Sequence, residues 1–388
     1  MSTVQEIEAR HSTGVYGKRD LVLVRGQGSR VWDENGRSYI DCIGGIAVAN
    51  VGHSHPQVVA AIARQAEQLI TCQEIFYNPQ RAALMERLTA VLPPGLDRLY
   101  FCNSGSEAVE SALKFARLST GRPHVVATMR GFHGRSLGAL SATFDKKYRQ
   151  PFMPLVPGFS HVPFDNIERL ETAVTDQTAA VILEIVQGEG GVRPGSAAYF
   201  QAARRLCDER GALLLVDEVQ TGFGRTGRWW ASQHMEIVPD LMALGKGMAG
   251  GIPMGAVAVG PRGQGFGIGL HGSTFGGNPV ACAAALAVLD VLANEGLVGR
   301  AAEMGRYFRV QLQTIESPLI REVRGLGLLI GVELKERAMP HVEALMARGI
   351  LALTAGTTVL RLVPPLVISR QEIDEVVAVV KEILTDKK

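Results

Sequence analysis

The sequence is poor in cysteine and nearly balanced in charge. Its five cysteines lie far apart and form no CxxC pair, so we expect them to be small core residues in a reducing compartment. The net charge is +2 over 388 residues, and basic residues form no long block. Nucleic acid is therefore not an expected partner.

Long apolar runs are also absent. The longest apolar stretch, residues 241–260, is interrupted by Lys246, by several glycines and by Pro253, and residues 1–10 are polar and acidic. We expect no membrane span, no signal peptide and a cytoplasmic location. The length predicts roughly two to three domains with an ample apolar core.

Lys246 is the one charged residue within that apolar stretch. Burial lowers the pKa of a lysine and a covalent imine removes its charge, so Lys246 is a candidate Schiff-base lysine; a lysine that reaches solvent from a strand end is the alternative. Upstream, residues 213–216 predict a buried strand that ends in Asp217. A strand-end aspartate and a buried lysine are what a pyridoxal phosphate enzyme needs, because the lysine holds the aldehyde carbon and the aspartate keeps the pyridine nitrogen protonated.

Strands and helices alternate through the middle of the chain. Strands predicted at residues 124–129, 179–185, 212–216 and 254–259 indicate an α/β fold with a mainly parallel sheet and helices on both faces. Residues 22–41 predict a small antiparallel meander with a turn at Asn35-Gly36, and the chain beyond Asn278 predicts an α+β layer. We therefore expect an N-terminal segment (1–55) that packs on a smaller C-terminal domain (278–388), and a large domain (56–277) between them.

Residues 99–107 combine a short strand, a Ser/Gly turn and the start of an alanine-rich helix. Free amides and the helix dipole at Gly105 and Ser106 favour phosphate binding, although a serine there also serves as a simple N-cap. After the next strand, Phe132 is suited to cover a planar ring and Arg135 to bind a carboxylate. Core packing and an exposed loop charge are the alternatives for these two.

Two other patterns favour structural roles. His53 and His55 have no third histidine or cysteine nearby, which favours a loop that caps the following helix over a metal site. The repeated glycines of residues 263–269 follow no strand and open no helix, which favours a loop over a dinucleotide-binding fingerprint. We expect no metal.

Six motifs follow one another in a fixed order: Asn103-Ser104-Gly105-Ser106-Glu107-Ala108, Gly131-Phe132-His133-Gly134-Arg135, Gln187-Gly188-Glu189-Gly190-Gly191, Asp217-Glu218-Val219-Gln220-Thr221-Gly222-Phe223-Gly224-Arg225-Thr226-Gly227, Lys246, and Gly272-Ser273-Thr274-Phe275-Gly276-Gly277-Asn278-Pro279. This set resembles the class III pyridoxal phosphate aminotransferases over essentially the whole chain. The likeness is greatest to acetylornithine aminotransferases, and it extends to the enzymes that act on a carrier-protein-bound aminoadipate semialdehyde in lysine biosynthesis.

The resemblance implies fold type I, pyridoxal 5′-phosphate as the cofactor, and a homodimer whose subunits share their active sites. It implies that Lys246 is the catalytic, cofactor-bound lysine and that the cofactor also contacts Gly105, Ser106, Phe132, Asp217, Val219, Gln220 and Thr274, the last from the neighbouring subunit. The implied substrate contacts are Tyr16, Arg135, Glu189, Ser273 and Arg361. The chain departs from the family at Glu184-Ile185-Val186, where proline commonly follows the glutamate.

The implied reaction moves a terminal amine from an N-acylated diamino acid, either N2-acetylornithine or a lysine on a carrier protein, to 2-oxoglutarate, and leaves a semialdehyde and glutamate. Glu189 would mask Arg361 for the first substrate and release it for glutamate; an inert ion pair is the alternative. Surface arginines such as Arg19, Arg25 and Arg149 are candidates to receive an acidic carrier. Other ω-aminotransferases (ornithine, succinylornithine or 4-aminobutyrate type), an aminomutase or decarboxylase, and a non-catalytic phosphate-binding protein are the alternatives.

Overall fold

The computed structural model describes residues 3–385, and its central layer is a seven-stranded sheet of order β4-β12-β11-β10-β7-β5-β6. The strands are β4 Arg98–Cys102, β5 His124–Thr128, β6 Phe159–Val162, β7 Thr178–Leu183, β10 Leu213–Asp217, β11 Leu241–Leu244 and β12 Gly255–Val259. β10 pairs in parallel with β7 and β11, and β5 with β6 and β7. The mainly parallel sheet is thus confirmed.

The strand β12 is the exception, because it runs antiparallel to both β11 and β4. Only residues 245–254 separate it from β11, too few for the helical crossover that a parallel connection needs. Two antiparallel pairings in succession leave β4 running in the same direction as β11. The carboxyl ends of β4, β7, β10 and β11 therefore lie along one edge of the sheet.

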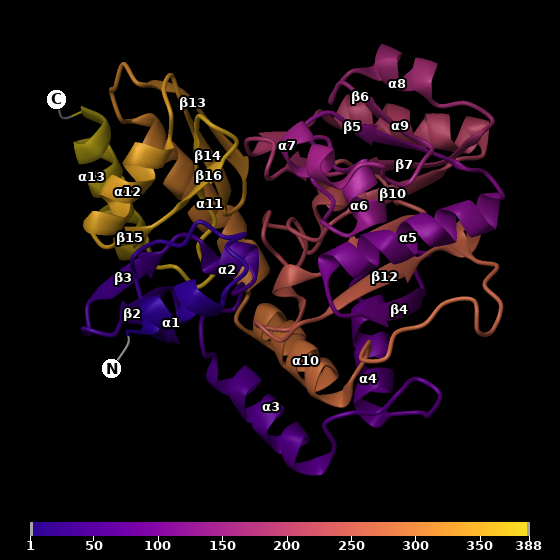
Figure 1. Ribbon diagram of the computed structural model, residues 1–388, viewed down its shortest axis with the longest axis horizontal. Coiled ribbons are helices and arrows are strands. Elements are labelled where there is room, and N and C mark those ends of the chain that lie inside the picture. The colour runs from indigo at the N-terminus through magenta and orange to yellow at the C-terminus, as the bar shows by residue number, and fades with distance from the viewer. Residues whose placement is uncertain (1–2, 386–388) are drawn as a thin grey trace.

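Helices cover both faces of this sheet, as the alternation of strands and helices predicts (Figure 1). On one face α5 (Gly105–Thr120) packs against Val125, Ala127 and the other side chains that point that way. On the other face α8 (Ile167–Ala173) and α9 (Ala197–Arg210) pack against the intervening residues, such as Val126. Strands buried on both faces explain the nearly continuous apolar runs in the sequence.

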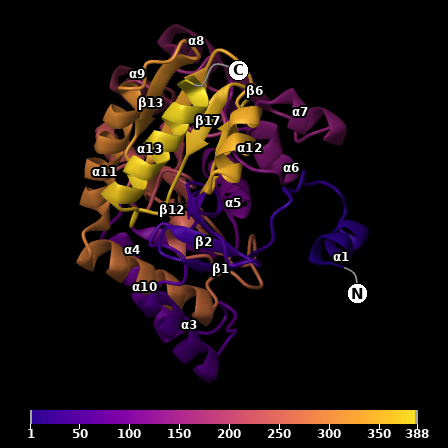
Figure 2. The same ribbon diagram turned by 90° about the vertical axis from the view of Figure 1, so that its left-hand side faces the viewer.

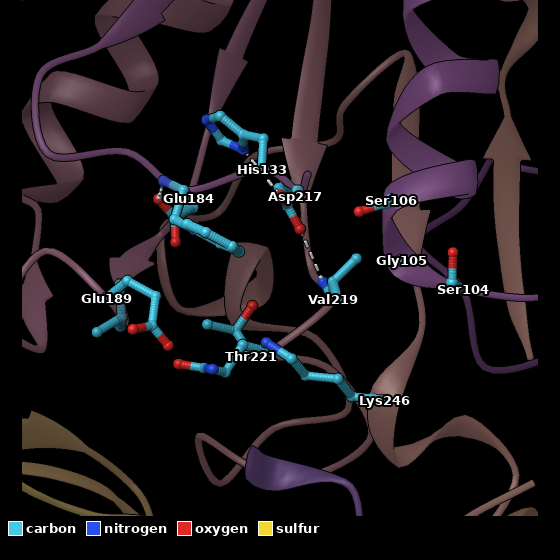
Figure 3. Close-up of a pocket in the computed structure, with 14 residues that line it drawn as sticks. Ser104, Gly105, Ser106, His133, Glu184, Glu189, Asp217, Val219, Thr221 and Lys246 are labelled. Atoms are coloured by element: carbon cyan, nitrogen blue, oxygen red, sulfur yellow. Dashed lines mark hydrogen bonds and ion pairs between the residues drawn. The ribbon is translucent and has the colours of Figure 1, made fainter. Parts of the chain in front are cut away.

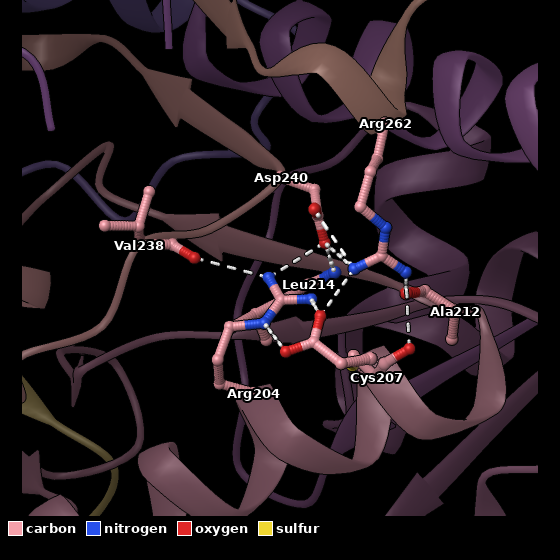
Figure 4. Close-up of polar contacts among 8 residues, drawn as sticks. Arg204, Cys207, Ala212, Leu214, Val238, Asp240 and Arg262 are labelled. Atoms are coloured by element: carbon pink, nitrogen blue, oxygen red, sulfur yellow. Dashed lines mark hydrogen bonds and ion pairs between the residues drawn. The ribbon is translucent and has the colours of Figure 1, made fainter. Parts of the chain in front are cut away.

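A charge cluster fixes α9 to the opposite edge of the sheet (Figure 4). Asp240, which precedes β11, accepts a hydrogen bond from the backbone amide of Leu214 at 2.7 Å and pairs with Arg204 of α9 at 2.9 Å. Arg262 pairs with both Asp208 and Asp240. These groups lie at the amino ends of β10 and β11, away from the edge where the candidate chemistry gathers, so we assign them a structural role.

The C-terminal part of the chain builds a second, four-stranded antiparallel sheet of order β13-β14-β17-β16. Its strands are β13 Ile320–Leu326, β14 Leu329–Leu334, β16 Leu353–Ala355 and β17 Val359–Leu362, and its helices are α11 Leu297–Gln313, α12 Met339–Ala347 and α13 Arg370–Thr385. The predicted N-terminal meander is present as β1 Leu23–Gln27, β2 Arg30–Asp33 and β3 Ser38–Asp41. β3 pairs in parallel with β15 (Ile350–Leu351), which places the meander beside the C-terminal part (Figures 1 and 2).

Several elements were not predicted from the sequence, and most of them are short. They include α1 Val4–His11, which stands apart in Figure 2, together with α2 Gly44–Ala47, α4 Pro79–Thr89, α6 Leu137–Ala142, α7 Lys146–Arg149, β8 Val186–Gln187 and β9 Arg193–Pro194. Two long helices, α3 Pro56–Gln68 and α10 Pro279–Asn294, each begin with a proline, a residue favoured at the first position of a helix. Within residues 3–385 no single helix meets the length and apolarity of a membrane span; the pair α10 and α11, bent by 63°, does so only jointly, and α10 is largely buried.

Candidate active site

The shared strand direction brings the candidate residues to one place. The turn after β4 carries Gly105, β7 is followed by Glu184, β10 ends in Asp217 and β11 is followed by Lys246. Ligands bind at this carboxyl edge in open α/β sheets. A cavity of about 230 Å³ opens there, and it is lined by Ser104, Gly105, Ser106, Phe132, His133, Gly134, Glu184, Val186, Glu189, Asp217, Val219, Gln220, Thr221 and Lys246 (Figure 3).

Lys246 begins a short 3-10 turn after β11 and extends its side chain into the cavity (Figure 3). Its φ of 45° is a conformation that costs a non-glycine residue about 1–3 kcal/mol, and such strain is common at functional sites. Burial lowers the pKa of its ammonium group, although Glu189 and Asp217 act in the opposite direction. A lowered pKa leaves more of the lysine as the neutral, nucleophilic amine, and the side chain lies in the cavity rather than at an open strand end.

Asp217 occupies the floor of the cavity and is held from two sides. Its Oδ1 accepts a hydrogen bond from the Val219 amide at 3.0 Å, and its Oδ2 lies 2.8 Å from Nδ1 of His133. Burial lowers the pKa of His133, but the bond to Asp217 outweighs it and the pKa of the imidazole is raised. The sequence placed His133 within a motif and indicated no role for it; its place in the loop that follows β5 was the available signal.

Glu184 is a second group that sequence reasoning left without a role. It is buried beside His133 and Asp217, and its Oε2 accepts a hydrogen bond from the Phe132 amide at 3.0 Å. Burial raises the pKa of this carboxyl group to about 7, with the charge of Asp217 adding to the effect and His133 opposing it. Glu184 is therefore a protonatable acid at neutral pH inside the cavity wall.

One end of the cavity is the amino end of α5. Ser104 is the N-cap, since its side chain accepts from the amide of Glu107, which leaves the first amides of the helix, at Gly105 and Ser106, facing the cavity. A Cβ on Gly105 would lie 2.5 Å from Cγ1 of Val219, so only glycine permits this approach. The cap is therefore present, and the amides of Gly105 and Ser106 beside it stay candidates for binding an anion.

The cavity wall also contains a polar group without a partner. Both amide atoms of Gln220 are buried and find no hydrogen bond within residues 3–385. A buried amide without partners is costly, which indicates that a polar ligand atom completes it. One cavity thus holds four groups, each suited to a different part of a ligand. The lysine suits an aldehyde, the carboxylate suits a basic ring nitrogen, the helix amides suit a phosphate, and the unpaired amide suits a ring hydroxyl. Pyridoxal 5′-phosphate is such a molecule.

Beyond Lys246 the cavity ends at an ion pair. Oε1 of Glu189 lies 2.6 Å from Nη1 of Arg361, and the Arg361 side chain is only 3% exposed. Arg135 lies outside the cavity, exposed at its mouth, with its guanidinium 4.3 Å from the ring centre of Tyr148 and its amide bonded to Ser106 Oγ. Two guanidinium groups beside one cavity suit a substrate with two anionic ends.

Besides Arg135 and Arg361, three more predicted residues do not line the cavity. Tyr16 is 81% exposed, Thr274 lies on an exposed loop, and Ser273 accepts a hydrogen bond from the side-chain amide of Asn103 at 3.1 Å. Their assignment to cofactor or substrate stays a prediction, and for Thr274 it depends on a second subunit. His55 caps α3 as expected from the sequence. Among residues 3–385, no group of three His, Cys, Asp or Glu residues is arranged to hold a metal ion.

Comparison with known proteins agrees with this cavity. The family model Aminotransferase class-III matches residues 14–384. The chain is 51% identical over 383 residues to a LysW-aminoadipate semialdehyde transaminase of Deinococcus radiodurans, covering 98% of this chain and 89% of that protein. It is 47% identical over 381 residues to an acetylornithine aminotransferase of Methanosarcina acetivorans, covering 98% and 96%.

A solved structure extends the agreement to three dimensions. The ornithine aminotransferase of Toxoplasma gondii, whose structure reveals partial occupancy of PLP at the active site, superposes with a TM-score of 0.93 at 35% identity, covering 97% of this chain and 92% of that chain. The likeness in sequence and the likeness in structure thus cover the same, nearly complete length of the chain.

Proposed function

The chain belongs to the class III aminotransferases, which use pyridoxal 5′-phosphate, and we propose that it transfers the terminal amine of an N-acylated diamino acid to 2-oxoglutarate. The products are a semialdehyde and glutamate, in arginine or lysine biosynthesis. The observation that carries this proposal is the meeting, in one cavity, of Lys246, Asp217 and the amino end of α5, with the Glu189–Arg361 pair at its far side.

The cofactor supplies an aldehyde that accepts the amine and a protonated ring that withdraws electrons from the reacting carbon. Lys246 would hold the cofactor through its aldehyde carbon. Once freed by the substrate amine, its Nζ would take a proton from the substrate carbon and deliver it to the former aldehyde carbon, which is the proton shift that transamination requires. Asp217 keeps the ring nitrogen protonated, and His133 orients the carboxylate. Gly105 and Ser106 bind the phosphate through backbone amides.

The remaining cavity residues place the ring and the substrate. Phe132 and Val219 would hold the cofactor ring between them, and the side-chain amide of Gln220 would donate to the ring hydroxyl. Arg135 binds the distal carboxylate of glutamate, while Arg361 binds its α-carboxylate. For the ω-amine donor, Glu189 stays paired with Arg361, so the donor's own α-carboxylate binds Arg135. Its terminal amine then lies beside the carbon that Lys246 holds.

An acyl group on the donor's α-amine has a chemical reason. Free glutamate semialdehyde cyclises onto its own amine, and acylation prevents this. The names of the relatives given above indicate that the group on the α-amine is either acetyl or LysW. A second cavity of about 450 Å³ adjoins the first and shares Phe132 and Glu189 with it. Its lining includes Arg130 and Lys146, two groups suited to a carboxylate, beside Asp145.

We further propose that the enzyme is a homodimer whose sites are shared. The loop that carries Ser273 and Thr274 exposes Phe266, Ile268, Leu270 and Phe275, with Ile268 fully exposed. Such a cluster of exposed apolar side chains favours burial against a second protein surface. On this view Thr274 of one subunit reaches the phosphate site of the other.

The first experiment compares donors. The yellow enzyme is mixed with N2-acetylornithine or with a LysW-lysine adduct in the absence of acceptor, and then with 2-oxoglutarate while glutamate is measured. Bleaching by the donor and recovery with 2-oxoglutarate are expected. A much higher kcat/KM for one donor assigns the pathway. If neither donor bleaches the enzyme, the proposed substrate class is wrong.

Shared sites have a separate test. Lys246→Ala and Thr274→Asp are each expected to be inactive, whereas their mixed dimers contain one site with both native residues. Recovery of about a quarter of the native activity after unfolding and refolding an equal mixture supports sharing, since half of randomly paired dimers are mixed and each has one intact site. No recovery contradicts it.

A further inference from the structure

The loop that carries Glu189 rests on the second sheet between two arginines. Residues 188–192 connect β8 to β9 and turn over β14 and β17. In that sheet Arg324 of β13 is paired with Gly331 of β14, and Gly331 is paired with Arg361 of β17. Directly paired residues of antiparallel strands point to the same face, so both arginines face the loop, with a glycine between them.

The space above Gly331 is filled by the loop itself. A Cβ on Gly331 would lie 2.9 Å from Cβ of Val192, and a Cβ on Gly191 would lie 3.3 Å from Nη2 of Arg324. Both contacts are tighter than ordinary packing, and Gly191 also has a φ of 108°. The loop therefore fits closely between the two arginines, and neither glycine tolerates a side chain without displacement.

The two arginines hold the loop by different groups. Arg361 binds the side-chain carboxylate of Glu189. Arg324 binds the backbone: its Nη2 donates to the Gly191 carbonyl at 2.6 Å, and its Nε donates at 3.1 Å to the carbonyls of Gly191 and Val192. Rotation of Glu189 away from Arg361 leaves every Arg324 bond intact.

Arg324 is itself held firmly. Its side chain is 9% exposed, and its guanidinium pairs with Glu333 and, at 2.7 Å, with Glu322. Glu333 in turn also pairs with Arg193 and Arg321. Burial raises the pKa of Glu333, but the bond to Arg324 outweighs it and the pKa is lowered, so the carboxylate stays charged. A buried arginine with a charged partner and two carbonyl acceptors is a rigid anchor.

We propose that Arg324 is a positioning residue that fixes the backbone of residues 188–192, so that the Glu189–Arg361 pair opens by side-chain rotation alone. This inference rests on the proposed function, because it assigns a task to Arg324 only if Glu189 masks Arg361 for one substrate and releases it for the other. Without the anchor, the loop withdraws and Glu189 masks Arg361 poorly. The enzyme then loses preference for the ω-amine donor.

The test measures the two half-reactions separately in Arg324→Met by the loss and return of cofactor absorbance. Expected is a fall of about tenfold in kcat/KM for N2-acetylornithine, or for the LysW-lysine adduct if that is the better donor, with a change of less than about threefold for L-glutamate. Arg321→Met is the matched control: it removes another arginine partner of Glu333, but its side chain is 60% exposed and pairs with Glu333 rather than with the loop. This control is expected to leave both half-reactions unchanged.

A double-mutant cycle distinguishes positioning from general damage. In a Glu189→Gln background the mask is already absent, so Arg324→Met is expected to add no further change in the ratio of the two half-reactions. Equal losses in both half-reactions, or an undiminished effect in the Glu189→Gln background, overturn the inference. If Arg324→Met does not fold, Arg324→Lys carries the same test, because lysine keeps the charge beside Glu333 and loses the planar fork. A native enzyme that uses neither ω-amine donor overturns the proposed function, and the inference with it.

Discussion

Nδ1 of His133 lies 2.8 Å from Oδ2 of Asp217, inside the wall of the cavity and out of contact with solvent. His133→Asn removes this charge-assisted hydrogen bond while keeping a side chain of similar polarity. We expect kcat to fall about tenfold, the size of effect expected for one such bond, with little change in thermal stability. The measurements are kcat and the position of the visible absorbance band of the bound cofactor. An unchanged kcat contradicts a catalytic role for the His133–Asp217 pair.

Lys246→Ala is expected to abolish transamination and the yellow colour, because no other lysine lines the cavity among the described residues. Protein and free cofactor are mixed, the excess is removed by gel filtration, and the visible spectrum is recorded. Lys381→Ala, on the exposed side of α13, is the control and is expected to behave as the native protein. A yellow and active Lys246→Ala protein would disprove the assignment.

Gly105→Ala tests the close approach of α5 to the strand-end loop. A Cβ there would lie 2.5 Å from Cγ1 of Val219, so the helix start or Val219 has to move. We expect cofactor affinity to fall at least about tenfold, because the amides that face the phosphate move with the helix start. The control is Gly299→Ala, in α11, where nothing lies within 4 Å of the added Cβ. Dissociation constants from cofactor titration of the apoenzyme decide the matter.

Glu189→Gln tests the mask. The glutamine keeps the shape but loses the charge that pairs with Arg361 at 2.6 Å. We expect kcat/KM for the ω-amine donor to fall about tenfold or more while the value for glutamate holds or rises, since Arg361 is then free for an α-carboxylate. Single-turnover absorbance with each substrate gives the two values. A parallel loss with both substrates would identify the ion pair as merely structural.

The raised pKa of Glu184 predicts that the stability of the protein depends on pH. The pKa of its carboxyl group is raised from 4.5 to about 7, so folding favours the protonated form. The contribution to stability is therefore complete below pH 4.5 and is lost as the pH rises through 7, with a magnitude on the order of 3 kcal/mol. In Glu184→Gln this loss disappears. Melting temperatures of the apoenzyme at pH 5 and pH 8 are expected to favour the variant more at pH 8.

The sequence predicts best those features that depend on neighbouring residues in the chain. The apolar run before Asp217 and the lone Lys246 in an apolar stretch identified two cavity residues, and the Ser/Gly turn before α5 identified the anion cradle. Resemblance to the family added Val219, Gln220 and the Glu189–Arg361 pair. The division into segments and the roles of Tyr16, Ser273 and Thr274 stay predictions.

What the sequence by itself determined was therefore the fold class and a set of candidate residues for the chemistry, because burial patterns, turn residues and strand ends are local properties. Which of these residues meet was decided only by the tertiary structure. His133 and Asp217 are 84 residues apart and Glu189 and Arg361 are 172 apart. No spacing along the chain expresses a contact between strands brought together by the order of a sheet. Nor does it express the placement of Arg324 and Arg361 on either side of Gly331, which follows from the register of three strands.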